Sequence, residues 1–181
     1  MNIPNALTLL RIALIPVFVS FLIYDKIEFA IVTFIVAGVT DALDGAVARM
    51  TNTKTQLGVL LDPLADKMLV LSALIALTIL ERIPLWLTAA VLGRDLVIVS
   101  GSVILYRMGH REKIRPTLIG KLTTFFLLAL LVVALIGLYV DREPALMPWL
   151  VWITTALVAV SGAHYLIRGF ALLGKKEVGP R

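Results

Sequence analysis

Cysteine is absent from this chain of 181 residues, and charged side chains are scarce. Without cysteine, the chain cannot form a small secreted fold held together by disulfides. Charged residues make up 16% of the chain, whereas about 25% is usual in a soluble domain. Because disordered chains are rich in charge and poor in apolar residues, this scarcity also excludes a disordered protein.

Hydrophobic residues, in contrast, make up 60% of the chain, and its mean hydropathy is +0.97. A soluble domain of this size buries only part of its surface on folding and could not remove so much apolar area from water. The composition therefore predicts an integral membrane protein.

Six long apolar stretches follow one another along the chain. A helix of about 20 apolar residues crosses the hydrocarbon layer because it satisfies its own backbone amides. We therefore expect an all-α integral membrane protein with six transmembrane helices, in one domain over residues 1–181. The stretches are Leu7–Tyr24, Ile27–Arg49, Gly58–Leu80, Pro84–Met108, Pro116–Val140 and Met147–Leu173.

Cations are distributed unequally between the two ends of these stretches. The loops after the first, third and fifth stretch hold only Lys26, Arg82 and Arg142. The opposite side, counting the ends of the stretches and the C-terminal tail, holds Arg49, Lys54, Arg107, Arg111, Lys113, Arg115, Lys121, Arg168, Lys175, Lys176 and Arg181. Since positive charge stays in the cytoplasm, both termini are predicted to be cytoplasmic, in the cell (inner) membrane. This basic face explains the net charge of +5 without a nucleic-acid partner, and it would attract anionic membrane lipids.

Four aspartates interrupt the second and third stretches near the same predicted cytoplasmic end. Asp41 and Asp44 are three residues apart, and Asp62 and Asp66 are four apart, so each pair shares one helix face. A carboxylate at membrane depth costs about 2.5–3.5 kcal/mol and marks a functional site by default. Four converging carboxylates stay ionised only beside cations. Two divalent ions, Mg²⁺ or Mn²⁺, match this oxygen donor set and suit phosphoryl transfer.

The four aspartates could instead have a structural role or a role in transport. Lys67 or Arg49 could form a structural salt bridge with one pair, but two cations cannot neutralise four carboxylates. Intramembrane acids also mark cation transporters. However, a conducting path needs polar residues along the full membrane depth, and the aspartates gather at one end. A purely structural membrane protein would leave them unexplained.

Small residues and one arginine accompany the aspartates. Gly45, Ala48 and Gly58 leave room for a neighbouring helix or a flat ligand, and close helix packing alone is the alternative. Arg49 can donate two parallel hydrogen bonds to a phosphate or serve as a cytoplasmic anchor.

Together these residues form the pattern Asp41-x2-Asp44-Gly45-x2-Ala48-Arg49-x8-Gly58-x3-Asp62-x3-Asp66. This pattern resembles the signature of the CDP-alcohol phosphatidyltransferases at every fixed position. The resemblance implies that Asp41, Asp44 and Asp62 ligate two divalent ions. It also implies that Asp66 is both a metal partner and the general base that deprotonates the acceptor hydroxyl. A homodimer is implied as well.

The resemblance also implies a site for CDP-diacylglycerol, with the CDP moiety received by Gly45, Ala48 and Arg49. Three polar residues lie in an N-terminal stretch similar to the branch that uses glycerol 3-phosphate: Asn5, Thr8 and Arg11. They would border this nucleotide site or cap and anchor the first helix.

An acceptor that carries its own phosphate needs further cations, and the candidates are Arg94, Arg115 and Lys121. Asp95 offers an alternative for Arg94, an internal ion pair between helices, and the other two could be interfacial anchors. These cations favour glycerol 3-phosphate as the acceptor. The Arg94-Asp95 pair also resembles the branch that makes cardiolipin and CMP from phosphatidylglycerol, and the same cations would serve that acceptor.

Overall fold

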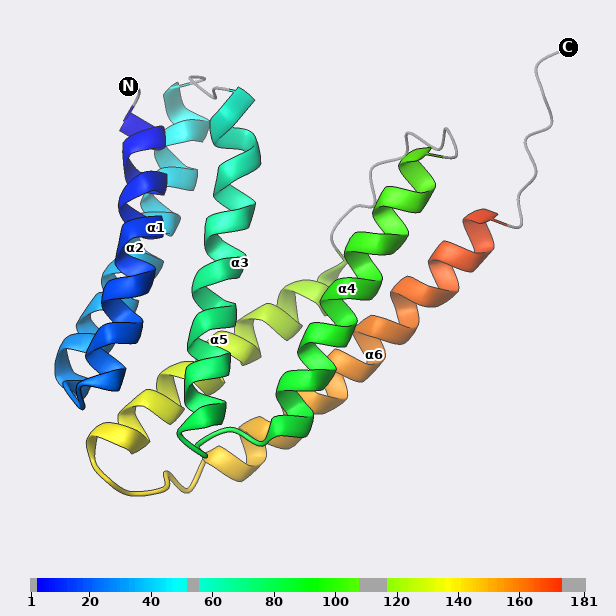
Figure 1. The fold of residues 1–181 in the computed structure, drawn as a ribbon. Helices are drawn as coiled ribbons and strands as arrows, with labels where there is room; N and C mark the ends of the chain where they lie inside the picture. The colour runs from blue at the N-terminus through cyan, green and yellow to red at the C-terminus, as the bar shows by residue number, and fades with distance from the viewer. Residues whose placement is uncertain (1–2, 52–55, 108–116, 174–181) are drawn as a thin grey trace, which may run out of the picture. The chain divides into compact units, whose positions relative to one another are not determined.

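The structure, a computed structural model, describes the backbone of residues 3–51, 56–107 and 117–173. Side chains are described for residues 8–40, 65–101, 103–104 and 117–167. Over these ranges the regular secondary structure consists of six α-helices (Figure 1). They are α1 (Ile3–Ile23), α2 (Ile27–Thr51), α3 (Gln56–Ile79), α4 (Leu85–Arg107), α5 (Leu118–Tyr139) and α6 (Met147–Leu173).

The predicted all-α class and the six helical stretches are confirmed. The largest difference in bounds is at the start of α1, which begins at Ile3 rather than at Leu7. Pro4 is its second residue, and proline is tolerated in the first turn, where the backbone N–H has no intrahelical partner. Within the described ranges, two helices are long and apolar enough to cross a membrane, Leu118–Tyr139 and Met147–Ile167. Six spans and cytoplasmic termini therefore stay predictions.

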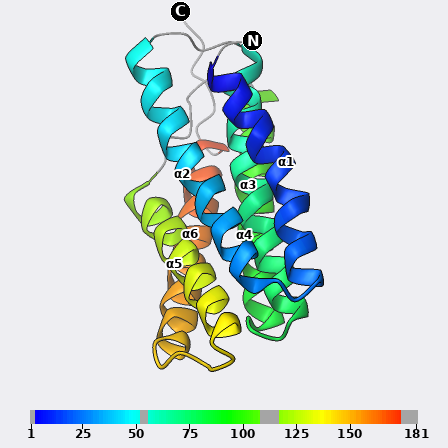
Figure 2. The same cartoon turned by 90° about the vertical axis from the view of Figure 1, so that its left-hand side faces the viewer.

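The chain forms two compact units. Unit 1 comprises Met1–Ile83 and Leu131–Pro144, and unit 2 comprises Pro84–Leu130 and Ala145–Arg181. In unit 1, α1 packs against both α2 and α3, and α2 also contacts α3 (Figures 1 and 2). Buried alanines let these helices approach closely, among them Ala30 and Ala37 of α2 and Ala73 of α3. Phe18 and Phe34 meet in the same core, with ring centroids 5.6 Å apart.

Helices α1, α3 and α5 end in the same kind of turn, in which an acidic residue has a left-handed backbone. The φ angles are 56° at Asp25, 58° at Glu81 and 50° at Asp141. In each turn the next backbone N–H, that of a lysine or arginine, donates to a carbonyl five residues earlier, at 2.8 to 3.0 Å. This is the Schellman arrangement, which satisfies carbonyls that a helix end leaves without partners. Each turn lies in the connection between two consecutive helices.

In unit 2, α4 packs along α6. Their buried side chains include Leu87 and Val91 of α4 and Val151 and Val158 of α6. Trp86 and Trp152 pair near the beginnings of these helices, with ring centroids 5.8 Å apart.

The outer faces of the helices carry large apolar side chains. Ile35 of α2, Phe125 of α5 and Trp149 of α6 are all at least half exposed. Soluble monomers rarely expose extensive apolar patches, because contact of such surface with water is unfavourable. These faces therefore suit an apolar surrounding such as lipid.

Candidate active site

The four aspartates occupy one layer of unit 1. The last residues of α2 and the first residues of α1 and α3 lie at the same end of this unit (Figures 1 and 2). At about 1.5 Å per residue, Asp44 and Asp41 lie about 10 and 15 Å before the end of α2, while Asp62 and Asp66 lie about 9 and 15 Å after the start of α3. Because the two helices are continuous and in contact, the backbone brings both pairs to the same depth.

Asp66 is the only one of the four aspartates whose side chain is described. It is half-buried on α3, beside Ala65 and Leu69, which are buried, whereas Lys67 is exposed. Most other expected residues of the site lie outside the described side chains: Asp41, Asp44, Asp62, Gly45, Ala48, Arg49, Gly58 and Asn5. Within the described part, no group of three potential metal ligands is found.

A fully buried arginine lies on the inner face of α1. Arg11 is 0% exposed, and Thr8, one turn earlier on the same face, is 1% exposed. Arg11 lies about 12 Å along α1 from Ile3, which is the depth of the aspartate layer on α2 and α3. Thr8 was expected near the nucleotide, and its burial places it on the face that packs against the other two helices. The signal for Arg11 in the sequence is a charge inside an apolar stretch.

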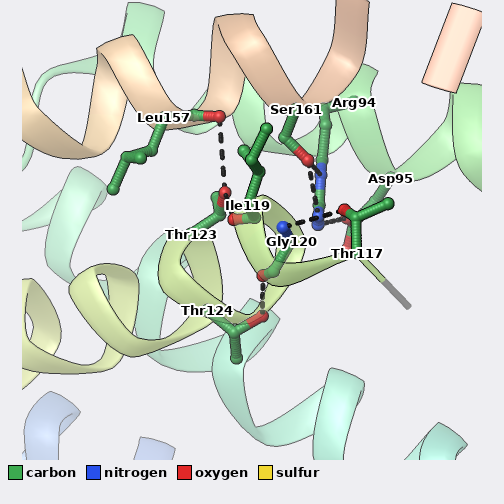
Figure 3. A network of polar contacts seen from close by, with 9 residues as sticks. All are labelled: Arg94, Asp95, Thr117, Ile119, Gly120, Thr123, Thr124, Leu157 and Ser161. Carbon is green, nitrogen blue, oxygen red and sulfur yellow. Dashed lines mark hydrogen bonds and ion pairs between the residues drawn. The ribbon is translucent and has the colours of Figure 1, made fainter. Parts of the chain in front are cut away.

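Arg94 forms a separate polar network in unit 2 (Figure 3). Its Nη1 donates to Asp95 Oδ1 at 2.8 Å, and its side chain is only 15% exposed. Its Nε and Nη2 donate to Ser161 Oγ at 3.4 and 3.1 Å. The ion pair with Asp95 thus exists, but it lies within α4 and does not join two helices. The link from α4 to α6 is instead the contact with Ser161.

The network extends to the beginning of α5. Thr117 Oγ1 accepts a hydrogen bond of 3.1 Å from the backbone N–H of Gly120, so Thr117 caps this helix. A Cβ atom at Gly120 would lie 3.5 Å from Arg94 Nη2, which places the guanidinium beside the first turn of α5. Lys121 follows Gly120 and is exposed. Arg94 and Lys121 therefore lie near each other, while Arg115 lies outside the described residues.

Comparison with known proteins places the chain in a family. A family model described as CDP-alcohol phosphatidyltransferase matches residues 1–160. The chain belongs to the CDP-alcohol phosphatidyltransferase family.

Relatives of this chain with assigned activities include two glycerol 3-phosphate transferases and a cardiolipin synthase. The CDP-diacylglycerol–glycerol-3-phosphate 3-phosphatidyltransferase of Aquifex aeolicus is 32% identical over 180 residues, covering 97% of this chain and 100% of the relative. The protein of the same name from Bacillus subtilis is 30% identical, covering 95% and 97%. A CMP-forming cardiolipin synthase of Streptomyces coelicolor is 36% identical over 134 residues, which cover 71% of this chain and 62% of that protein.

The sequence does not indicate three further residues of the Arg94 network: Ser161, Thr117 and Gly120. A serine or a glycine in an apolar helix is equally typical of close packing, so the residue type alone does not indicate a site. The only signal was the cost of burying Arg94 itself, which requires acceptors nearby.

Proposed function

We propose that this chain transfers the phosphatidyl group of CDP-diacylglycerol to sn-glycerol 3-phosphate, which yields phosphatidylglycerophosphate and CMP. The observation that carries the proposal is the similarity to the Aquifex aeolicus transferase over almost the whole of both chains. The complete aspartate pattern on α2 and α3 supports the same reaction.

In this reaction a hydroxyl oxygen of the acceptor attacks the phosphorus that bears diacylglycerol. A new P–O bond forms to the acceptor, and the P–O bond to CMP breaks. Asp66 takes the proton of the attacking hydroxyl, for which its half-buried position at the aspartate layer is suitable. Arg49 donates hydrogen bonds to the diphosphate, and Gly45 and Ala48 leave space for the CDP moiety.

The donor set fits divalent cations, because Asp41, Asp44, Asp62 and Asp66 offer only carboxylate oxygens, which Mg²⁺ and Mn²⁺ prefer. The helical register of α2 and α3 brings both pairs to one depth, and we infer that the four aspartates hold two ions. Such ions, when bound, supply the positive charge that stabilises the diphosphate and the departing CMP. Chelation with EDTA should abolish CMP release, and added Mg²⁺ or Mn²⁺ should restore it.

The acceptor phosphate is assigned to the beginning of α5 in unit 2. Arg94 lies beside its first turn, Lys121 belongs to that turn, and Arg115 precedes it in the sequence. A helix N-terminus and several cations together favour a phosphate dianion.

A membrane location follows from the substrates as well as from the helices. The two acyl chains of the donor stay in lipid, while its headgroup and glycerol 3-phosphate arrive from the cytoplasm. We infer six spans in the cell (inner) membrane, with both termini and the aspartates facing the cytoplasm, and a homodimer. The asymmetric distribution of cations and the exposed apolar faces support this arrangement.

A second candidate function is the CMP-forming synthesis of cardiolipin, with phosphatidylglycerol as the acceptor. The similarity to the Streptomyces coelicolor cardiolipin synthase and the Arg94-Asp95 pair favour it. That relative is longer than the region it shares with this chain, whereas the two glycerol 3-phosphate transferases match over nearly their full length.

Purified protein supplied with CDP-diacylglycerol, Mg²⁺ and one acceptor at a time decides between these functions. We expect CMP and phosphatidylglycerophosphate with glycerol 3-phosphate, and no cardiolipin with phosphatidylglycerol. Cardiolipin as the only lipid product would replace the main proposal by the second. Absence of CMP release with both acceptors would refute both.

A further inference from the structure

Ser161 fixes the orientation of Arg94 from a neighbouring helix. Its hydroxyl is fully buried on α6 and accepts from both Nε and Nη2 of Arg94 on α4 (Figure 3). Asp95 accepts from Nη1, and the ring of Tyr165 lies 6.0 Å from the guanidinium carbon. A long side chain with many rotamers is therefore held in one position before any ligand arrives.

These contacts leave part of the guanidinium available. A guanidinium carries five N–H groups: one on Nε and two on each terminal nitrogen. Ser161 and Asp95 accept from three of them. One N–H on Nη1 and one on Nη2 thus have no partner among the described residues. Two adjacent donors of this kind can bind two oxygens of one phosphate.

Gly120 has no side chain, so other polar groups can pack closely against its Cα atom. A Cβ at this position would lie 3.3 Å from both Thr117 Oγ1 and Tyr165 Oη and 3.5 Å from Arg94 Nη2. The Cα atom of Gly120 is therefore surrounded by three polar groups: Arg94 Nη2 from α4, Thr117 Oγ1 at the start of α5 and Tyr165 Oη from α6. Any larger residue would have to displace at least two of them.

From this geometry we propose that Ser161 is a positioning residue that orients Arg94 toward the acceptor phosphate, and that Gly120 permits this arrangement because it has no side chain. The proposal rests on the function proposed above and extends it to two residues outside the aspartate pattern. Ser161 acts through its hydrogen bonds to Arg94, whereas Gly120 acts by letting Arg94, Tyr165 and Thr117 pack against its Cα atom.

The first test replaces Ser161 by alanine and measures KM for each substrate separately. Because a hydrogen bond to a charged group is lost, we expect Ser161→Ala to raise KM for glycerol 3-phosphate about tenfold or more and to leave KM for CDP-diacylglycerol unchanged. Ser100→Ala is the matched control, since Ser100 is an exposed serine of α4 that bonds only to carbonyls of its own helix. It should behave as wild type.

A double substitution tests whether Ser161 acts through Arg94. Lysine at position 94 keeps the charge but lacks the planar fork that Ser161 holds. On the Arg94→Lys background, Ser161→Ala should therefore raise KM for glycerol 3-phosphate no further. Independent, additive effects would overturn the positioning role, and so would an equal rise of both KM values in Ser161→Ala alone.

The second test uses Gly120→Ala, which adds a methyl group beside Arg94, Thr117 and Tyr165 without removing any of their polar groups. We expect KM for glycerol 3-phosphate to rise at least fivefold while KM for CDP-diacylglycerol stays constant. Gly93→Ala on α4 is the control, because a Cβ there meets nothing within 4 Å and the gain in helix propensity is the same. Wild-type kinetics of Gly120→Ala would overturn the role of Gly120.

Different results would refute the proposed function and the positioning role of Ser161. Wild-type protein that forms no phosphatidylglycerophosphate would overturn the proposed function and this inference together. Wild-type activity combined with an unchanged KM in Ser161→Ala would overturn the positioning role alone.

Discussion

Two arginines are withdrawn from solvent inside apolar helices of this chain, and their surroundings indicate different tasks. Arg94 has two N–H groups without a partner among the described residues, and we propose that they bind the acceptor phosphate beside a helix N-terminus in unit 2. Arg11 is completely buried in unit 1, at the depth of the four aspartates. A guanidinium without solvent requires negative partners, and the acidic residues that the sequence places in this layer are those aspartates. Arg11 is therefore suited to balance charge within the protein rather than to capture a ligand.

Replacement of Arg11 by methionine tests this role. Removing one member of a buried set of charges costs about 3–5 kcal/mol, because the remaining charges stay buried without compensation. We expect Arg11→Met to lower the free energy of unfolding in detergent by about this amount and to abolish CMP release. Arg11→Lys keeps the charge and should lose less stability. Equal stability of wild type and Arg11→Met would show that the buried guanidinium balances no charge.

Asp66 is assigned the proton of the acceptor hydroxyl, and its amide variant tests this assignment. Loss of a general base typically slows a reaction about 10²- to 10⁴-fold. Asp66→Asn should therefore fold normally and retain CDP-diacylglycerol binding, with kcat reduced by at least a hundredfold. Glu28→Gln is the control for the change of charge, since Glu28 is exposed in the first turn of α2, at the opposite end of that helix. An Asp66→Asn variant with kcat close to that of wild type would exclude Asp66 as the base.

At the scale of elements, three of the helices end in turns of the same kind. The turns at Asp25, Glu81 and Asp141 share a left-handed acidic residue followed by a cation. Arg82 from the second turn donates to Asp141 of the third at 3.2 Å, but Asp141 is almost fully exposed, so this pair contributes little to stability. The backbone hydrogen bonds of the turns are therefore more important than the charges that mark them in the sequence.

The last turn of α5 contains a glycine that the adjoining loop requires. A Cβ at Gly137 would lie 2.7 Å from Pro144 Cδ and 3.1 Å from the carbonyl oxygen of Arg142. Because neither the proline ring nor the backbone can yield easily, Gly137→Ala should destabilise unit 1 by about 1–3 kcal/mol, as overpacking substitutions do. Gly38→Ala on α2, where a Cβ meets nothing within 4 Å, should not destabilise it. Thermal unfolding of both variants in detergent measures the difference. A Gly137→Ala variant as stable as Gly38→Ala would show that the loop can shift.

The sequence predicts the helices of this protein better than it predicts the contacts between them. Helix bounds agree closely because each apolar stretch must satisfy its own backbone amides, which is a local requirement. The sequence offers an ion pair of Arg94 and Asp95 between helices as one alternative; the pair exists because the two residues are adjacent, but it lies within α4. The contact of Arg94 with Ser161 joins residues 67 positions apart. It could not be predicted, because a serine in an apolar helix shows no preference for one distant partner over another.

At the scale of the whole molecule, the proposed reaction requires one orientation in the membrane. Glycerol 3-phosphate is a cytoplasmic metabolite that cannot cross lipid without help, so the aspartate layer has to face the cytoplasm. We therefore expect the cation-rich loops and the C-terminal tail on that side and the three acidic–basic turns on the other. The proposed six crossings, an even number, would place both termini on the same side.

The absence of cysteine makes this orientation directly measurable, because a single introduced thiol has no native competitor. Lys26 and Glu143 are exposed residues of the first and third turns, and Lys175 belongs to the C-terminal tail. A membrane-impermeant maleimide added to intact cells should label Lys26→Cys and Glu143→Cys, and it should label Lys175→Cys only after permeabilisation. The cysteine-free wild type provides the blank. Labelling of Lys175→Cys in intact cells would put the tail and the first turn on the same side, which six crossings forbid. Labelling of Lys175→Cys alone in intact cells would indicate the opposite orientation in the membrane, in which the aspartates have no access to their cytoplasmic acceptor.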